Sequence, residues 1–159
     1  MIRIGHGYDV HQLMAGRNLI LGGVHIPHTK GLAGHSDADV LIHAICNACL
    51  GAAGLGDIGR HFPDSDEQYK NIASRELLRK VHAMIAARGW SLVNLDSTIV
   101  AQAPHLAPYM QKMMAHIAAD LNVPVTSINI KAATTEKLGF TGREEGIAAH
   151  VVVLLASDK

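Results

Sequence analysis

The stretch IAAHVVVLLA, residues 147–156, decides the fold. It is apolar except for His150 and rich in β-branched valine, which favours an extended strand over a helix of this length. A nearly continuous apolar run is typical of a strand that is covered on both faces. We therefore expect a buried strand here, and one of its two covers could be another subunit.

Working outward from this strand, turn residues and apolar periodicity divide the rest of the chain into further elements. The first two predicted strands flank the short segment 14–17 and could form a hairpin. Ser36 is the predicted N-cap of the first helix, and Ser74 that of the second. The predicted strands are 2–11, 18–26, 92–101 and 127–134, and the predicted helices are 36–53, 74–88 and 104–121. This order predicts an α+β sandwich, with helices on one face of a single mixed sheet.

Composition limits the classes of function. The chain has 159 residues, of which 48% are hydrophobic and 18% charged, as expected for one domain, 1–159. Its formal net charge of +0 provides no broad cationic surface, so we expect no nucleic-acid partner. The apolar run 148–156 is far shorter than the ~20 residues that span a membrane. No secretory leader is readable, and we expect a bacterial, cytoplasmic protein.

Two cysteines, Cys46 and Cys49, have the CxxC spacing of a redox pair or half a zinc site. Redox thiols lie at helix N-termini, where the helix dipole lowers the thiol pKa. These two lie in the middle of an apolar, alanine-rich helical run. We therefore interpret them as small core residues.

Asp9 and His11 are two residues apart on a predicted strand, so their side chains share one face. If His43 in the following helix faces the same point, a carboxylate and two imidazoles form a ligand set that suits zinc. Three protein ligands leave one coordination position open, as in catalytic zinc sites. The alternative is a hydrogen-bonded, partly exposed Asp–His pair.

Two further groups of residues could bind phosphate. His35 and Ser36 stand at the predicted start of a helix, where free amides attract anions, although Ser36 could simply cap the helix. The segments 133–137 and 139–143 combine hydroxyls, a carboxylate, cations and glycines, which suit a diphosphate with a divalent ion. An ordinary polar turn is the alternative for this second group.

Several long strings carry a family resemblance that runs nearly end to end. The chain resembles the 2-C-methyl-D-erythritol 2,4-cyclodiphosphate synthases. The matching strings are RIGHGYDVH (3–11), LGGVHIP (21–27), HSDAD (35–39), LGAAGLGDIGR (50–60), FPDSD (62–66), AQAP (101–104) and TTEKLGFTGR (134–143).

The resemblance implies an activity and an assembly. Members of this family convert 4-diphosphocytidyl-2-C-methyl-D-erythritol 2-phosphate to 2-C-methyl-D-erythritol 2,4-cyclodiphosphate and release CMP, in non-mevalonate isoprenoid biosynthesis. The substrate's own 2-phosphate attacks the β-phosphorus of its CDP group. The family pattern implies a homotrimer with active sites at the subunit boundaries, each with one Zn²⁺ and with Mg²⁺ or Mn²⁺ on the substrate diphosphate.

The resemblance also implies roles for individual residues. Asp9, His11 and His43 resemble the zinc ligands, Glu136 the magnesium-binding carboxylate, and His35 and Thr134 the transition-state stabilisers. The positions that resemble substrate-binding residues are Asp9, Val10, His11, His35, Ser36, Asp57, Ile58, Gly59, Phe62, Pro63, Asp64, Ser65, Asp66, Phe140 and Arg143. Those that resemble the cytidine pocket are Ala101, Gln102, Ala103, Pro104, His105, Leu106, Ala107, Ala133, Thr134, Thr135 and Glu136.

Some positions leave questions for experiment. His105 stands where the family commonly has lysine, and Ala133 where threonine is common, so nucleotide affinity could be weaker than usual. Phe140 and Arg143 suggest, as a hypothesis, an isoprenoid diphosphate in the central cavity of the trimer. Two other functions remain open: a zinc-dependent nucleotide-diphosphate hydrolase, and a non-catalytic trimer that binds nucleotides or isoprenoid diphosphates.

Overall fold

The structure, a computed structural model, describes residues 1–158; residue 159 of the predicted domain 1–159 lies outside the described residues. The strands are β1 (Ile2–Ala15), β2 (Leu19–Leu21), β3 (Val24–Ile26), β4 (Lys30–Leu32), β5 (Ser91–Val100), β6 (Ile128–Ala133) and β7 (Gly146–Ala156). The α-helices are α1 (Val40–Ala52), α2 (Ile58–His61), α3 (Ser74–Ala86), α4 (Met110–Asp120) and α5 (Gly139–Gly142). Short 3₁₀ helices lie at Glu67–Tyr69, Ala107–Tyr109 and Val125–Ser127.

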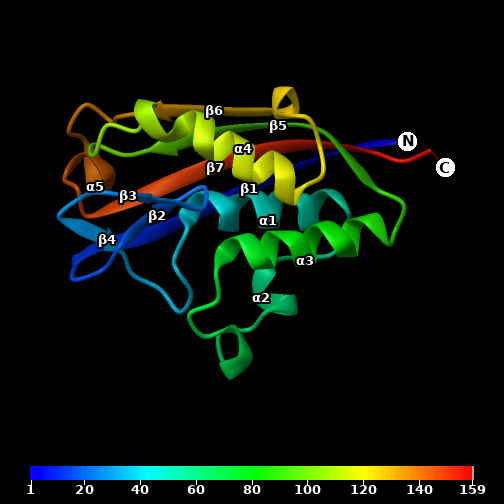
Figure 1. The fold of residues 1–159 in the computed structure, drawn as a ribbon, viewed down its shortest axis with the longest axis horizontal. Coiled ribbons are helices and arrows are strands. Elements are labelled where there is room, and N and C mark those ends of the chain that lie inside the picture. The colour runs from blue at the N-terminus through cyan, green and yellow to red at the C-terminus, as the bar shows by residue number, and fades with distance from the viewer. Residues whose placement is uncertain (159) are drawn as a thin grey trace.

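Five strands form the main sheet, in the order β4-β1-β7-β5-β6 (Figure 1). The pairs β4–β1, β1–β7 and β7–β5 are antiparallel and β5–β6 is parallel. Strands β2 and β3 form a separate two-stranded sheet. The predicted strand 147–156 is confirmed as β7, at the centre of the main sheet. The prediction of a mixed sheet with helices on one face is also confirmed.

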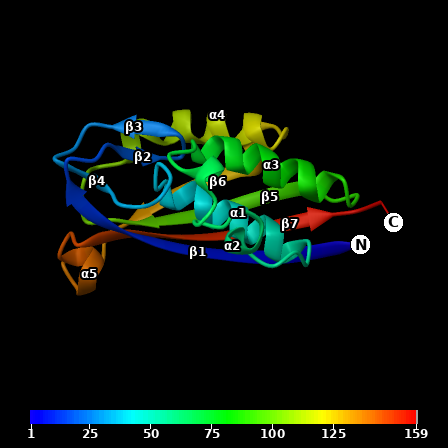
Figure 2. The same cartoon turned by 90° about the horizontal axis from the view of Figure 1, so that it is seen from below.

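The helices α1, α3 and α4 lie on the same side of the main sheet (Figures 1 and 2). Every second residue of β7 from Ile147 to Leu155 is buried toward them, because side chains alternate between the two faces of a strand. On the opposite face Val152 is 49% exposed and His150 is exposed. Among residues 1–158, therefore, only one face of β7 is fully covered.

Two glycines of β1 allow α1 to lie directly on the strand. A Cβ atom at Gly5 would be 2.0 Å from the carbonyl oxygen of Ala48, and one at Gly7 would be 1.8 Å from that of Ala44. No side chain larger than hydrogen fits at these distances, so the backbones of helix and strand touch. This contact brings the first turn of α1 against the part of β1 that follows Gly7.

The predicted hairpin of strands 2–11 and 18–26 is wrong. Strand β1 continues to Ala15 and pairs with β7 and β4. The second predicted strand is interrupted by Gly22 and Gly23, which have φ values of +57° and +73°. Two consecutive left-handed residues form the tight turn that a two-residue hairpin requires, so β2 pairs with β3 across it.

The predicted start of the first helix at Ser36 is also wrong. Ala38 has a φ of +57°, so the chain enters α1 only after Asp39, whose carboxylate accepts a hydrogen bond from Ile42 N at 3.1 Å. The same carboxylate accepts from Gly22 N and Gly23 N, which ties the β2–β3 turn to the start of α1. Helix α3 begins at Ser74, as predicted for the second helix. Its N-cap position, however, is Ala73, whose side chain forms no capping hydrogen bond.

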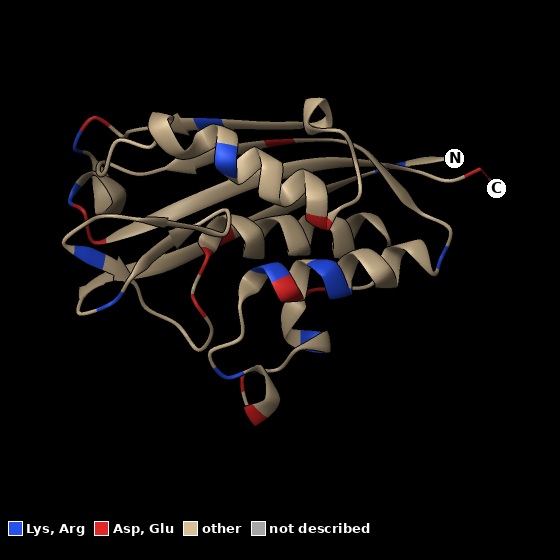
Figure 3. Cartoon of the chain, viewed as in Figure 1, with Lys and Arg blue, Asp and Glu red and all other residues tan. Residues whose placement is uncertain are grey.

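The structure also shows the surroundings of the two cysteines and the distribution of the charged residues. Cys46 and Cys49 are free and fully buried, and burial raises the pKa of Cys49 to about 12, so their interpretation as core residues is confirmed. Basic and acidic positions are interspersed along the ribbon (Figure 3). Among residues 1–158, no helix combines the length and the apolar character that a membrane crossing requires.

Candidate metal centre

Asp9, His11 and His43 converge on one point. Asp9 and His11 project from the helix-facing side of β1, and His43 projects from the first turn of α1. Asp9 Oδ2 lies 2.9 Å from His11 Nε2 and 3.3 Å from His43 Nδ1, and the two nitrogens are 3.3 Å apart. The prediction that these three side chains face the same point is confirmed, and together they form a group that could hold a metal ion.

The hydrogen bonds around this group leave unshared electron pairs at its centre. His11 Nδ1 donates to the carbonyl oxygen of Ala33 at 2.7 Å, so the Nε2 of the neutral imidazole carries no hydrogen. Asp9 Oδ2 is buried and has no hydrogen-bond donor. A buried acceptor without a donor is costly, whereas a cation at that point would satisfy it. This observation fits a resident metal ion.

Electrostatics prepare Asp9 to bind a cation. Burial raises the pKa of Asp9, but the neighbouring His11 and His43 outweigh burial and lower the pKa to about 2. For His11, burial lowers the pKa, while the carboxylate of Asp9, to which Nε2 of the protonated imidazole would donate a hydrogen bond, raises it above its usual 6.5. Asp9 is therefore ionised at neutral pH. One oxygen and two imidazole nitrogens are ligands that zinc accepts, with a fourth position left open.

The candidate metal ligands lie in a cleft of about 280 Å³, which we call the metal cleft. It brings the three side chains together with several residues for which the sequence predicted phosphate or substrate contacts. The Nε2 atom of His35 is buried there without a partner. The metal cleft is lined by Asp9, His11, Gly34, His35, Ser36, His43, Asn47, Ile58, Gly59, Phe62 and Asp64.

Most of the predicted cytidine residues line a second cavity, of about 290 Å³, between the end of β5, the end of β6 and the start of α4. We call it the β5–β6 cavity. It shares no residue with the metal cleft. The β5–β6 cavity is lined by Ala101, Gln102, Pro104, His105, Leu106, Ala107, Met110, Ala132, Ala133 and Thr134.

Other predicted site residues line neither space. Asp57 is the N-cap of α2 and accepts from Arg60 N at 3.0 Å. Arg143 forms an ion pair with Glu145 at 3.2 Å, beside α5. The predicted residues outside the metal cleft and the β5–β6 cavity are Val10, Asp57, Pro63, Ser65, Asp66, Ala103, Thr135, Glu136, Phe140 and Arg143.

Four residues in or beside the metal cleft were not among the predicted site residues: Gly34, Asp37, Asn47 and Ser74. Asn47 lines the cleft, and its Oδ1 accepts from Ile58 N at 2.9 Å; its position four residues after His43 could have indicated a shared helix face. Ser74 Oγ lies 2.9 Å from His43 Nε2 and also contacts Asp37. No sequence pattern indicates this pair, because 37 residues separate Asp37 from Ser74.

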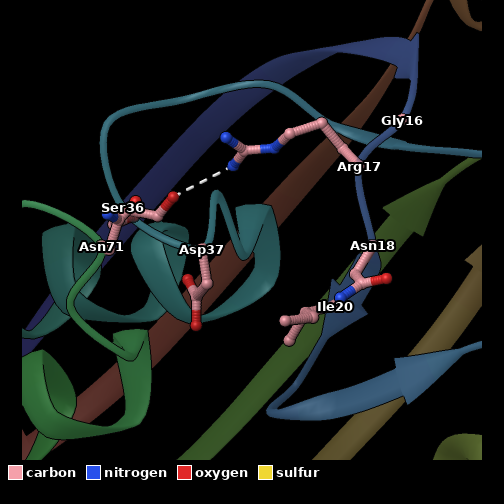
Figure 4. A pocket seen from close by; sticks show the side chains of 7 residues that line it. All are labelled: Gly16, Arg17, Asn18, Ile20, Ser36, Asp37 and Asn71. Carbon is pink, nitrogen blue, oxygen red and sulfur yellow. Dashed lines mark hydrogen bonds between the residues drawn. The ribbon is translucent and has the colours of Figure 1, made fainter.

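A third cavity, of about 320 Å³, is lined by Gly16, Arg17, Asn18, Ile20, Ser36, Asp37 and Asn71 (Figure 4). Arg17 crosses this cavity and donates hydrogen bonds to the carbonyl oxygens of Leu32, Gly34 and Ser36, at 3.0, 3.3 and 3.1 Å. Figure 4 shows the bond to Ser36. The guanidinium group thus holds, through three backbone carbonyl groups, the loop that carries His35 and Ser36.

Comparison with known proteins gives consistent results. The model of the YgbB family matches residues 2–156. Proteins named 2-C-methyl-D-erythritol 2,4-cyclodiphosphate synthase from Nitrosomonas eutropha and Geobacillus thermodenitrificans are each 61% identical to this chain; the matches cover 98% of it and 93% and 97% of those proteins.

Two solved structures are also similar. A bifunctional IspDF from Campylobacter jejuni superposes with a TM-score of 0.95 at 46% identity, over 99% of this chain and 42% of that one. A CDP complex of IspF from Plasmodium falciparum has a TM-score of 0.87 at 32% identity, over 99% and 97% of the two chains.

Proposed function

The chain belongs to the YgbB family, and from this premise we propose that it is a 2-C-methyl-D-erythritol 2,4-cyclodiphosphate synthase. The proposed reaction converts 4-diphosphocytidyl-2-C-methyl-D-erythritol 2-phosphate to the 2,4-cyclodiphosphate. An oxygen of the 2-phosphate bonds to the β-phosphorus, the bond from that phosphorus to the bridging oxygen breaks, and CMP leaves. We further propose that this reaction takes place in the cytoplasm.

One observation carries the proposal. Asp9, His11 and His43 present one oxygen and two nitrogens to a single point, in the same cleft as His35 and Ser36. A cation held there would lie beside side chains that can hold phosphate oxygens. We propose that this cation is Zn²⁺, and that Glu136 engages Mg²⁺ or Mn²⁺ bound to the substrate diphosphate. When bound, such ions neutralise the charge that gathers on the phosphate oxygens.

In the proposed mechanism the protein supplies position rather than a nucleophile. His35 and Ser36 would hold one phosphate in the metal cleft, and Thr134 would contact the diphosphate near the cytidine. Fixing both ends of one substrate makes the attack intramolecular, and such positioning can lower a barrier by about 7–11 kcal/mol. His35, whose Nε2 has no partner in the metal cleft, can donate to an oxygen on which charge develops.

We propose that two copies of the chain complete each active site, within a homotrimer. The metal cleft and the β5–β6 cavity share no residue in one chain, so a neighbouring copy can bring its cavity to the cleft. On the face of the main sheet that no helix within residues 1–158 covers, Ile4 (76%) and Val152 (49%) are exposed, and such an assembly would bury them. An isoprenoid diphosphate near Phe140 and Arg143 remains a proposal for the same assembly.

Phosphorus NMR of the purified protein with the substrate, zinc and magnesium tests the reaction. We expect CMP together with a cyclic diphosphate. CMP with only an open-chain bisphosphate would instead identify a zinc-dependent hydrolase, because both reactions release CMP. Saturable binding of CDP without any turnover would identify the non-catalytic binding protein.

A further inference from the structure

We propose that Asp37 and Ser74 are positioning residues that fix the imidazole of His43 in the tautomer whose Nδ1 is free to bind the metal. They act through a relay of hydrogen bonds from His43 to Ser74 and from Ser74 to Asp37. This inference rests on the metal site proposed above, and it names what orients one of the three ligands of that site.

Asp37 is the fixed end of the relay. Its Oδ1 accepts from the backbone nitrogen of Asp39 at 3.1 Å, and its Oδ2 accepts from that of Ser74 at 2.9 Å. The second bond supplies the side-chain cap that α3 lacks at Ala73. Two amides from different segments thus hold the carboxylate in place. Figure 4 shows Asp37 in the loop that precedes α1.

Ser74 is the middle of the relay. Its side chain is fully buried, and its hydroxyl contacts both Asp37 Oδ1 and His43 Nε2. A carboxylate oxygen can only accept, so the single hydroxyl hydrogen of Ser74 is donated to Asp37. Toward His43, the Ser74 oxygen can therefore offer only unshared electron pairs.

This arrangement determines where the hydrogen of His43 lies. A bare Nε2 would place two electron pairs against each other, 2.9 Å apart, in a buried site. Nε2 therefore carries the hydrogen and donates it to Ser74. In a neutral imidazole Nδ1 is then free, and Nδ1 is the atom that faces Asp9 Oδ2 at 3.3 Å.

The competing tautomer shows why the relay matters for the metal site. With the hydrogen on Nδ1, His43 would donate to Asp9, and that hydrogen would occupy the space of the metal. Ser36 Oγ, 3.2 Å from His43 Nε2, is a second acceptor, but its own hydrogen is not committed to a carboxylate. Only Ser74, whose hydrogen is donated to Asp37, requires His43 Nε2 to be the donor in their hydrogen bond. Loss of partners that orient a ligand typically costs 10–100-fold in metal affinity.

The test uses three variants of the full chain. Ser74→Ala removes the relay. Asp37→Ala frees the Ser74 hydroxyl to turn toward His43 Nε2. Ser97→Ala is the matched control, because Ser97 is also a buried serine, but its hydroxyl donates to the carbonyl oxygen of Asn129 on β6, an edge strand of the sheet.

The first measurement is the tautomer of His43 in metal-free protein that carries ¹⁵N-labelled histidine. Two-bond proton–nitrogen correlation spectra are recorded about two pH units above the usual imidazole pKa of about 6.5. The His43 signals are those absent from His43→Ala. We expect the Nε2–H form in the wild type and Ser97→Ala, loss of that preference in Ser74→Ala, and mainly the Nδ1–H form in Asp37→Ala.

The second measurement is zinc affinity, by competition with a chromophoric chelator. We expect affinities about 10–100-fold weaker in Ser74→Ala and Asp37→Ala, and an unchanged affinity in Ser97→Ala. Wild-type tautomer and wild-type affinity in both relay variants would overturn the proposal. If Ser74→Ala does not fold, Asp37→Ala decides by the same measurements. If the wild type itself binds no zinc, the proposed metal site fails, while the tautomer still decides the relay.

Discussion

The carboxylate of Asp9 is shared by two imidazoles in a space that is only slightly open to solvent. The side chains of Asp9, His11 and His43 are 23%, 18% and 14% exposed. Without a cation, only protons can relieve the repulsion among their electron pairs. Metal ions and protons therefore compete for the same atoms.

Removing His43 tests the site most directly. We expect His43→Ala to keep its fold but to lose bound zinc and at least about a hundredfold in turnover, because even the loss of an orienting partner costs 10–100-fold. Metal analysis and CMP release measure the two effects. His25→Ala, an exposed histidine on β3, is the control and should resemble the wild type. Full activity in a zinc-free His43→Ala protein would contradict the site.

The pH dependence follows from His11. Its pKa in the folded chain is raised above 6.5, so the stability from its pair with Asp9 is present below pH 6.5 and is lost as the pH rises through the raised pKa. Zinc requires the neutral imidazole, so zinc affinity should increase over the same range, by up to about tenfold per pH unit. Thermal unfolding of metal-free and zinc-loaded protein across this range should therefore show opposite slopes.

The sequence predicted the three candidate metal ligands because the period of two places Asp9 and His11 on one face, and because the family resemblance adds His43. It could not predict the partners of those ligands. Ser74 interacts with His43 across 31 residues, and only the packing of α3 beside α1 brings them together. Ser74 has the sequence signature of a helix cap, while its hydroxyl in fact bonds to a carboxylate in another loop.

At the scale of elements, the contact between α1 and β1 sets the geometry of the site, because these two elements carry all three candidate metal ligands. We expect Gly7→Ala to destabilise the fold by at least about 2 kcal/mol, since its Cβ would overlap the backbone of α1. Gly51→Ala is the matched control. Nothing lies within 4 Å of its Cβ position, so the change should gain about 0.5–1 kcal/mol in helix α1.

Denaturant unfolding of the metal-free proteins distinguishes these two glycines. A Gly7→Ala variant with the wild-type midpoint would show that α1 can move away from β1 at little cost. If α1 does move, His43 moves with it, so zinc affinity should fall together with stability. Zinc affinity in Gly51→Ala should stay unchanged.

Which elements the sequence could predict depended on the kind of signal. The apolar run of β7 and the helical periodicity of α3 were sufficient to predict these two elements, because burial alone produces such patterns. The ends of elements required tertiary information. Strand β1 extends to Ala15 because β4 pairs with it there, and α1 starts late because Asp39 bonds to the β2–β3 turn.

At the scale of the whole molecule, the uncovered face of the main sheet predicts self-association. Ile2, Ile4 and Tyr8 of β1 and Val152 of β7 are 68%, 76%, 47% and 49% exposed. Sedimentation or light scattering should give the mass of three chains. Ile4→Asp should weaken the assembly and lower turnover while the helical signal stays unchanged. A wild-type protein that is active as a monomer would contradict this prediction.

Met1 and Ser157 lie side by side, since they bond to each other through their backbones and Ile2 pairs with Ala156. Figure 1 shows both at one end of β1 and β7. His11 lies nine residues along β1, roughly 30 Å away at 3.3 Å per residue. A short peptide could therefore join the ends into a circle that is reopened at an exposed turn. Such a circularly permuted chain should keep its fold and its metal cleft, because the joining peptide would lie at the end of the sheet far from the cleft.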